Sequence, residues 1–524
     1  MSFLARISNR RSSFKKRIDP TESRRKRYET SINIGRKKKE EQLMKKRNIA
    51  ITSPDNTIDN YDLYIKQRLK ELPDFVIGLS STSKSDKRYS LSQIRKLVSV
   101  EKNPPITEVV ETGALSLIVP FLRDFKHPKL QFESAWIITN IIADGSKHAK
   151  MVVKQNSIPL LVDLLKSQNE EVVEQAIWAI GNLAADRAKY RDILLKQNTL
   201  NILIDVLTNT KNSGIFQNVT WTITNFFRGR PPPQFSEIQN AIPYLIQLLS
   251  NNDKEVISDA CWGISYLVHR LFKYLSQDFF SQVNPKLISL FSSDQPKIII
   301  PAIKAVGYIF VGSIDQSHAL IQLNLLHILS NLLLVPKSQI QKEICWFLSY
   351  TAEFAPNQML AILKSTEIIP RLLSLMNSSD FQMRQEAAWV LSNIITYGNV
   401  ENIDFLVQNG AIKSLCNLLE INDTDIIILV LDALLAVLEA GEKFGNDINR
   451  YATIIEESDG LNHINNLFTH NNEDIYLKSL EIIQRFFTNE DSEDDSIMPD
   501  IIENDNQPRF SFGTPDSEPR KFQV

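Results

Sequence analysis

Residues 134–144 read SAWIITNIIAD, and this stretch contains the repeating unit from which the chain is built. At 100° per residue of an α-helix, Ile138 and Ile141 fall on one side. Trp136 and Asn140 fall on the opposite side, one turn apart. The tryptophan therefore faces away from the isoleucines, and its contacts have to be sought outside the helix's own core face.

All six tryptophans of the chain lie in segments of this kind. Neighbouring tryptophans are separated by 42, 43, 41, 84 and 43 residues, and 84 is two steps of 42. The skipped position, Lys304, lies in PAIKAVGYIFVG, which has the same pattern without the tryptophan. A period of about 42 is typical of armadillo or HEAT-type helical repeats. By this spacing the array runs from about residue 89 to residue 487, as about nine or ten repeats.

Composition and helix boundaries favour an all-α fold. Of the 524 residues 43% are hydrophobic and only 16 are glycine, fewer than is typical of all-β chains. The segments SIPLLVDLL, AIPYLIQLL and IIPRLLSLM place proline in the first turn of a helix, where its missing N–H is tolerated. Each repeat is thus expected to contain such a helix, a polar turn and the tryptophan helix. Stacked repeats predict a right-handed superhelical armadillo solenoid with a concave groove.

Several kinds of site are excluded by motif. Cys261, Cys345 and Cys416 show no CxxC spacing, so we expect small buried side chains in a reducing compartment. The seven histidines show no metal spacing, and Walker, HExxH and GxSxG motifs are missing. We therefore expect no enzyme, no catalytic residues and no metal or other cofactor. No signal peptide follows Met1 and no apolar run reaches ~18 residues, which predicts a soluble intracellular protein without membrane insertion.

Charge is distributed unevenly along the chain. Residues 1–50 carry 17 Lys or Arg and 5 Asp or Glu, which gives this head a charge of +12. Because the net charge of the whole chain is −2, the remainder carries −14. A basic head on an acidic body can bind an external partner or the body itself. Residues 489–506 contain 8 acidic and no basic side chains, which is typical of a disordered tail.

The tryptophan side of the repeated helix predicts a binding surface. Three positions before each tryptophan stands a polar residue: Glu133, Gln175, Asn218, Asp259, Glu343 and Glu386. One such tryptophan is better explained by packing between repeats, but six copies flanked by carboxylates and amides favour binding. Asparagine at +4 can hold both polar groups of a peptide unit, and indole faces attract Lys and Arg by roughly 0.5–2 kcal/mol each. The expected ligand is an extended peptide rich in lysine and arginine, whereas nucleic acid is repelled.

The motif Trp-x-x-x-Asn on helices of this period resembles the importin α family, the nuclear import adaptors that bind basic nuclear localisation signals. SVEKNPPI (residues 99–106) is similar to the family's segment before the first repeat. HNNEDIYLKSLEIIQRFF (residues 470–487) is similar to its last repeat. The head, FKKRIDPTESRRKRYETSINIGRKKKEEQLMKKRN (residues 14–48), resembles the importin-β-binding segment. The resemblance covers almost the whole chain.

The resemblance implies four parts of the chain. They are an importin-β-binding segment with an autoinhibitory KKRN (1–54), a flexible linker (55–88), armadillo repeats with the cargo groove (89–487) and a disordered acidic tail (488–524). The matching head residues are Phe14, Lys15, Arg24, Arg25, Lys26, Arg27, Lys45, Lys46 and Arg47. KKRN is expected to lie in the groove until importin β removes it. Gly35 stands where a basic residue is usual, which predicts a lower affinity for importin β.

In this family the tighter cargo site spans the second to fourth repeats. The matching residues here are Trp136, Asn140, Gln175, Trp178, Asn182, Asp186, Asn218, Trp221, Asn225, Arg228, Asp259 and Trp262. Asp186 matches the acid that pairs with the key cargo lysine. Ala149 stands where a threonine is usual, which removes a hydroxyl partner. We expect this site to be intact.

A second, weaker family site spans the sixth to eighth repeats. Its residues here are Lys304, Glu343, Trp346, Glu386, Trp389 and Asn393. Tyr308 and Tyr350 replace asparagines, Lys304 replaces an arginine, and Ile314 replaces an acidic residue. A tyrosine hydroxyl cannot copy the paired donor and acceptor of an amide. We therefore expect weak binding here and a preference for signals with one basic cluster.

The resemblance implies cargo proteins, importin β and a nuclear export receptor as partners, with shuttling between cytoplasm and nucleus through nuclear pores. Two other functions fit part of the sequence. A cytoplasmic armadillo scaffold explains the repeats but not the basic head. A nucleic-acid-binding protein that uses the basic arm predicts salt-dependent binding by residues 1–54 alone.

Overall fold

The structure, a computed structural model, describes residues 58–100, 103–365, 367–378, 380–443, 449–487, 500–504 and 507–511. The chain divides into two compact units, Met1–Leu290 and Phe291–Val524, here called the N-terminal and C-terminal units. The predicted flexible basic head lies outside the described residues, as does most of the predicted disordered tail.

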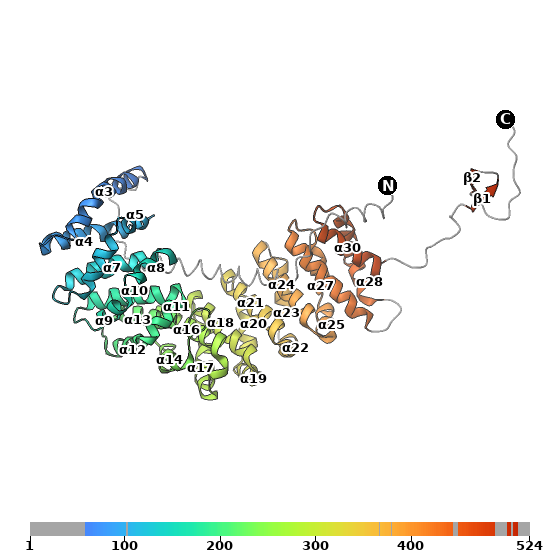
Figure 1. Cartoon of the computed structure of the whole chain (residues 1–524). Helices are drawn as coiled ribbons and strands as arrows, with labels where there is room; N and C mark the ends of the chain where they lie inside the picture. Colours follow the sequence, from blue (N-terminus) through green and yellow to red (C-terminus); the bar gives the residue numbers. More distant parts are fainter. Residues whose placement is uncertain are drawn as a thin grey trace. The chain divides into compact units, whose positions relative to one another are not determined.

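The N-terminal unit is a succession of helices in which short ones alternate with long ones (Figure 1). In chain order these are α3 (Ile58–Gly78), α4 (Lys84–Val98), α5 (Ile106–Glu111), α6 (Ala114–Ile118), η1 (Val119–Arg123), α7 (Pro128–Ala143), α8 (Ser146–Lys154), α9 (Ser157–Leu164), α10 (Glu170–Asp186), α11 (Ala188–Lys196), α12 (Thr199–Asn209), α13 (Ser213–Phe226), α14 (Phe235–Ile238), η2 (Gln239–Ala241), α15 (Ile242–Leu248), α16 (Lys254–Leu271), η3 (Phe272–Tyr274) and α17 (Gln277–Ser289). The short η4 turn (Leu290–Ser292) follows at the boundary in the sequence.

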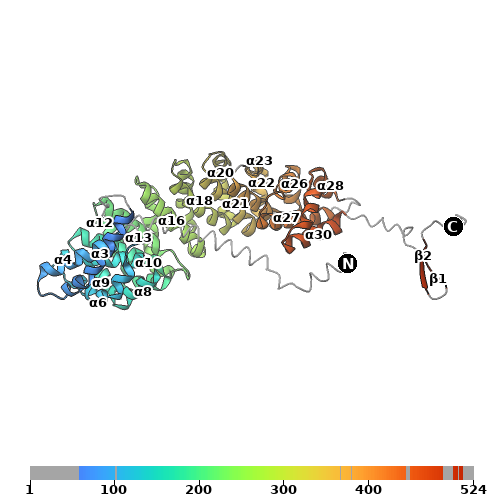
Figure 2. The ribbon, with the colours of Figure 1, turned by 90° about the horizontal axis from the view of Figure 1, so that it is seen from above.

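The C-terminal unit continues the same alternation. It contains α18 (Pro296–Gly312), α19 (Ile314–Gln322), α20 (Leu325–Leu333), α21 (Ser338–Phe354), α22 (Pro356–Ser365), α23 (Ile368–Met376), α24 (Phe381–Tyr397), α25 (Val400–Gln408), α26 (Ala411–Leu418), α27 (Thr424–Glu442), α28 (Arg450–Glu457), α29 (Gly460–Asn466), η5 (Leu467–Thr469), α30 (Glu473–Phe486), β1 (Asp500–Asn504) and β2 (Gln507–Ser511). Figure 2 shows α20, α23 and α26 in one row of this unit and α21, α27 and α30 in another.

The predicted repeat is confirmed, with one more helix than expected. Each tryptophan lies in a long helix, and α9, α15 and α23 carry their prolines in the first turn, as predicted. An additional short helix is present in several repeats. The helices α8, α11, α19 and α25 are each nine residues long and precede α9, α12, α20 and α26, of which α9 carries the proline. Such a helix is shorter than the window of about 11–18 residues over which hydrophobic periodicity identifies helices.

Asparagine or aspartate begins many of the long helices. The capping residues are Asn169, Asn212, Asp253, Asp380, Asp423 and Asn472. The side chain of each accepts a hydrogen bond from a backbone N–H of the first turn, which stabilises a helix by about 1 kcal/mol. The polar turns predicted between helices therefore act as caps that fix where each long helix begins.

The structure differs from the prediction of a flexible linker over residues 55–88. Helix α3 occupies most of that segment and packs against α4. Leu72, Phe75 and Leu79 are buried there, and the Ser83 side chain caps α4 by accepting from the Asp86 backbone N–H. The few apolar residues of α3 are enough for a helix because they are spaced to face one neighbour.

Part of the predicted disordered tail also has regular structure. β1 and β2 pair antiparallel, with Ile501 opposite Phe510 in the register. β-branched and aromatic residues favour strands, so this short apolar cluster within an acidic segment forms a hairpin. The rest of the regular structure within the described ranges is helical, in agreement with the all-α prediction.

Successive long helices pack closely because small residues stand between them. In α10, Gly181 lies against α13, and a Cβ atom there would overlap the Trp221 ring and lie 2.6 Å from Thr222 Oγ1. Trp221 is accordingly buried, with 7% of its surface exposed. Glycine at this position lets the backbone of one repeat approach the indole of the next.

We predict that Gly181→Ala lowers the free energy of unfolding by about 1–3 kcal/mol, because an added methyl group overpacks this contact. The urea unfolding of the chain, followed by helical circular dichroism, measures the change. Gly214→Ala is the matched control, since the nearest atom to its Cβ, Asn212 Oδ1, would lie 3.3 Å away and no ring would be overlapped. Equal destabilisation by both substitutions would contradict the packing argument.

Candidate peptide-binding surface

Four tryptophan helices lie side by side in the N-terminal unit: α7, α10, α13 and α16 (Figure 1). We call Trp136, Trp178, Trp221 and Trp262 on these helices the N-terminal ladder. Trp136, Trp178 and Trp262 are partly exposed, whereas Ile138 and Ile141 on the other side of α7 are fully buried. The predicted division between a core face and a tryptophan face is therefore present, although Trp221 is more buried than expected.

The ladder asparagines connect neighbouring repeats. Asn182 Nδ2 donates to Thr139 O at 3.4 Å, and Asn225 Nδ2 donates to Gly181 O at 3.3 Å. Asn140 Nδ2 donates in the same way to Val98 O at 3.1 Å. From the sequence these amides are expected to face a peptide. In the structure an N–H group of each donates to a backbone carbonyl of the preceding long helix, from α7 to α4, from α10 to α7 and from α13 to α10. Asn140 and Asn225 are buried for the same reason, with 1% and 0% of their surface exposed.

The ladder nevertheless contains buried polar atoms with no hydrogen-bond partner within the described chain. They are Trp136 Nε1, Trp178 Nε1, Gln175 Oε1 and Asn225 Oδ1. Two are donors and two are acceptors, and they come from three successive helices. Buried polar groups in native proteins are nearly always paired, so each of these atoms calls for a partner. An extended peptide supplies both N–H and C=O groups at regular intervals.

Carboxylates lie beside the ladder. Asp186 ends α10, and its Oδ1 accepts a hydrogen bond of 2.5 Å from Ser146 Oγ. Its Oδ2 accepts no hydrogen bond from the part of the chain that the structure describes, although Nε of the exposed Arg187 lies 3.5 Å away. Glu174 accepts from Asn218 Nδ2 at 2.9 Å, and burial raises its pKa, which the bond from Asn218 partly opposes. A cation that reached this region would meet carboxylate oxygen atoms that are partly shielded from water.

Ala149 is fully buried in α8, one turn after Ser146. The structure thus gives Asp186 a hydroxyl partner from Ser146, which sequence analysis did not single out. Asp186 and Ser146 are 40 residues apart, so no local pattern could have paired them.

The fourth rung of the N-terminal ladder carries a tyrosine at the asparagine position. Tyr266 stacks on Trp262 with ring centroids 5.8 Å apart and an interplanar angle of 26°. Burial raises the pKa of Tyr266 to about 12, while the nearby Arg228 lowers it and Asp259 raises it. Arg228 and Asp259, both predicted site residues, thus act electrostatically on the same tyrosine. The i, i+4 spacing from Trp262 is the signal that could have identified Tyr266.

A buried arginine fixes the backbone of Arg228. Arg191 has none of its surface exposed, and it donates to Arg228 O at 2.5 Å and to Pro231 O at 2.9 Å. Its charge is balanced by Asp192 at 2.7 Å. Sequence analysis did not identify Arg191, because its partners lie about one repeat further along the chain.

At Trp136, the first tryptophan of the N-terminal ladder, a cation of the chain itself, Arg95, lies over the indole ring. The Arg95 guanidinium carbon lies 4.5 Å from the Trp136 ring centroid, and Arg95 Nε lies 2.5 Å from Glu133 Oε2. Glu133, the polar residue three positions before Trp136, is thus engaged within the chain. An arginine at this distance above an indole is a cation–π contact.

The predicted second site lies in the C-terminal unit, on α18, α21 and α24. Lys304 forms an ion pair with Glu343, and its Nζ lies 3.3 Å from the Trp346 ring centroid. Burial lowers the pKa of Lys304, and Glu343 and Glu386 oppose that shift. Asn393 Nδ2 donates to Ser349 Oγ at 2.7 Å, again one repeat back, and Trp389 is partly buried. The exposed Ile314 offers no carboxylate here.

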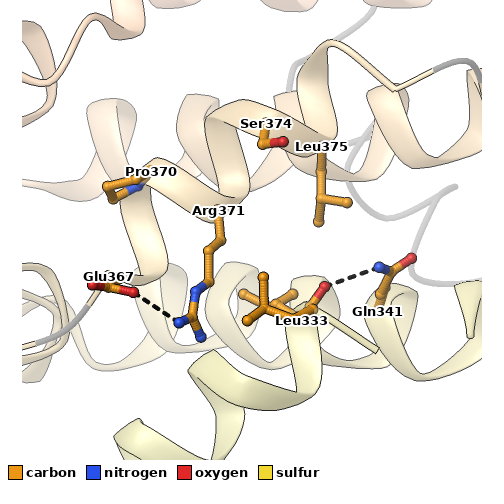
Figure 3. Close-up of a pocket in the computed structure, with 8 residues that line it drawn as sticks. Leu333, Gln341, Glu367, Pro370, Arg371, Ser374 and Leu375 are labelled. Carbon is orange, nitrogen blue, oxygen red and sulfur yellow. Dashed lines mark hydrogen bonds and ion pairs between the residues drawn. The ribbon is translucent and has the colours of Figure 1, made fainter. Parts of the chain in front are cut away.

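Other features of the described chain offer no competing site. A cavity of about 470 Å³ between α20 and α23 is lined by Leu333, Pro370 and Leu375 (Figure 3). The cation at its wall, Arg371, is already held by Glu367 and Ser330. Within the described ranges, no helix is long and apolar enough to cross a membrane. The same ranges contain no group of three or more His, Cys, Asp or Glu arranged to hold a metal ion.

The cysteines are buried and unpaired, as predicted. Burial raises the pKa of the Cys416 thiol to about 12, and it also raises the pKa of Cys261 and Cys345. Thiols with raised pKa values are unreactive at neutral pH, which agrees with their expected role as small core side chains.

Comparison with known families and proteins agrees with this arrangement. Residues 10–90 match the family described as importin beta binding domain, which extends through α3 into α4. Residues 102–143, 145–185, 231–269, 313–353 and 358–396 match the armadillo/beta-catenin-like repeat, and residues 449–500 match an atypical Arm repeat. A solved engineered protein shares the fold, with a TM-score of 0.62 and 21% identity over 79% of this chain and 98% of that protein.

Relatives match over nearly the full length. Importin subunit alpha-4 of Arabidopsis thaliana is 35% identical over 98% of this chain and 97% of the relative. Importin subunit alpha-B of Dictyostelium discoideum is 37% identical over 94% of this chain and 95% of the relative. The chain therefore belongs to the importin α family, whose members are nuclear import adaptors and not enzymes.

Proposed function

We propose that the N-terminal ladder binds the lysine- and arginine-rich nuclear localisation signals of cargo proteins. The observation that carries this proposal is a set of buried polar atoms that have no hydrogen-bond partner among the described residues, on Gln175, Trp178 and Asn225 together with Trp136 Nε1. These donors and acceptors match the backbone of an extended peptide. If the chain were a scaffold that bound no extended peptide here, there would be no reason for these buried polar atoms to be left without hydrogen bonds.

Specificity for lysine follows from the groups around this row of atoms. The aliphatic stem of a lysine can lie against an indole while its ammonium remains near the ring face. Asp186 Oδ2 accepts no hydrogen bond from the described residues, so it is the expected partner of the key ammonium. The Ser146 hydroxyl holds the other oxygen and fixes the direction of this carboxylate. Nucleic acid is disfavoured at a surface that presents carboxylates.

We also propose that the head carries the bound cargo to importin β and masks the groove in its absence. The match of residues 10–90 to the importin-β-binding domain supports the first part. The charge of +12 on residues 1–50 and the sequence KKRN at 45–48 support the second. A nuclear export receptor that returns the adaptor, and shuttling between cytoplasm and nucleus, complete the proposed cycle. The second site is proposed to bind cargo weakly.

Trp178→Ala is predicted to weaken the binding of a lysine-rich signal peptide by about 30-fold, since a buried interface tryptophan contributes about 2 kcal/mol or more. Fluorescence anisotropy with a labelled peptide measures the change in Kd, in chains whose Lys45, Lys46 and Arg47 are replaced by alanine so that the head does not compete for the groove. Phe125→Ala is the matched control, because Phe125 is an exposed aromatic residue of the same unit outside the ladder. If both variants bind as the parent does, the ladder is not the cargo site and the scaffold function gains support.

A further inference from the structure

A charged side chain of the chain itself lies on two tryptophans, and the two arrangements repeat each other. Arg95 lies over Trp136 and pairs with Glu133; Lys304 lies over Trp346 and pairs with Glu343. In both cases the acid stands three residues before the tryptophan, and the cation comes from a position about one repeat earlier that has no tryptophan. The two tryptophans differ in the residues that contact the parts of the indole not covered by the cation, because at Trp346 a second aromatic ring, that of Tyr350, is stacked on the indole.

The ring of Trp346 is enclosed by its neighbours. Tyr350 stacks on it with centroids 5.1 Å apart and an interplanar angle of 19°. A stacked ring and an ammonium 3.3 Å from the same centroid need separate faces, so Lys304 and Tyr350 cover both faces of the indole. On the α18 side, a Cβ at Gly307 would lie only 2.9 Å from Trp346 Cζ3, so this edge touches backbone.

Tyr308 closes the remaining side. Its ring meets Trp346 and Tyr350 edge-on, with both centroid distances at 5.4 Å and interplanar angles of 74° and 89°. Tyr350 in turn contacts Phe354 at 4.6 Å. The result is a continuous aromatic cluster that includes the +4 position after Trp346, where Trp136, Trp178 and Trp221 of the N-terminal ladder are followed by asparagine.

We propose that Lys304, Tyr308 and Tyr350 occupy the second site from within and thereby make the chain selective for signals with a single basic cluster. An incoming lysine would need an open indole face and an unpaired carboxylate. Both are already taken, since Lys304 uses one face of Trp346 and the charge of Glu343, and Tyr350 uses the other face. Displacing Lys304 would also leave its partly buried ammonium without the Glu343 carboxylate, and an unpaired charge in such a position is unfavourable in free energy.

This inference rests on the proposed function, because it concerns the choice among basic peptides. Its test is a gain of binding. In the full chain with Lys45, Lys46 and Arg47 replaced by alanine, Lys304→Ala, Tyr308→Asn and Tyr350→Asn are combined. The control carries Tyr308→Phe and Tyr350→Phe, which keep the rings and Lys304. Isothermal titration with a single-cluster lysine peptide gives the number of sites, and thermal unfolding by circular dichroism shows that each variant is folded.

The parent in this test is the chain with alanine at Lys45, Lys46 and Arg47 and no other change. The parent and the Phe control are expected to bind one peptide, and the triple variant is expected to bind two. A two-cluster peptide is expected to bind the triple variant about 10-fold or more tighter than the single-cluster peptide, and the parent with less than a twofold difference. Two sites in the parent, or one site in a folded triple variant, would overturn the inference while leaving the proposed function intact. If the parent binds none and the triple variant binds one, the N-terminal ladder is not a cargo site, but the inference stands.

Discussion

Asp186→Asn is expected to weaken the binding of a lysine-rich signal peptide by about 30-fold to 5000-fold. Removing one partner of a partly buried, hydrogen-bonded charge pair costs about 2–5 kcal/mol, because the other charge is then left without compensation. The Asp186 side chain is only 12% exposed, so water can replace it poorly. The asparagine still accepts from Ser146 Oγ through its amide oxygen, so the fold of α10 should be retained.

The measurement is a titration with two peptides, one with the full signal and one with its key lysine replaced by alanine. Every chain compared, the parent included, carries alanine at Lys45, Lys46 and Arg47, so that the head does not compete with the peptides. The parent should distinguish the peptides strongly, and the Asp186→Asn chain should distinguish them little. Asp163→Asn removes the same charge from an exposed position of α9 and is the matched control. A loss as large in the control as in Asp186→Asn would mean that net charge, and not a specific pair, holds the lysine.

Replacing Lys45, Lys46 and Arg47 by alanine in the full chain is expected to tighten cargo-peptide binding by about 100-fold. A tethered segment reaches an effective concentration of roughly millimolar, and with an intrinsic Kd on the order of 10 μM it would occupy the groove in about 99% of molecules. Removing its three charges frees that groove. Adding importin β to the parent chain should have the same effect.

The matched control replaces Lys37, Lys38 and Lys39, three basic residues of the same head, by alanine. This variant has the same net charge as the first but keeps KKRN, so its peptide affinity should remain near that of the parent. An equal gain in both variants would show that the head acts by general charge and not by occupying the groove. No gain in either would remove the internal switch from the account.

The repeat could be predicted from the sequence because local signals coincide at every period. Trp178 and Asn182, a capping Asn169 and an apolar face with Ile177 and Ile180 all lie within one helix and its turn. Helix α3 was harder to predict, since the burial of Leu72 and Phe75 depends on a neighbour, α4, that the local pattern does not reveal.

The contacts that the individual binding-surface side chains make could not be predicted from the sequence, because they join residues about one repeat apart. The bond from Asn225 to Gly181 O, and the pairing of Lys304 with Trp346, span 44 and 42 residues. Tyr308 and Tyr350 could be recognised in sequence as departures from the family, but not as parts of one aromatic cluster. How close two repeats approach is set by residues such as Gly181, and only the structure shows which side chains then meet.

The N–H signals of the tryptophan indoles test the central claim most directly. The chain contains six tryptophans, so ¹⁵N-indole labelling gives six signals, which single Trp→Phe variants assign. With Lys45, Lys46 and Arg47 replaced by alanine, addition of a single-cluster lysine peptide should shift the signals of Trp136 and Trp178, whose Nε1 atoms have no partner within the described ranges. The signal of Trp346 should not shift. A shift of Trp346 with Trp136 and Trp178 unchanged would contradict the account.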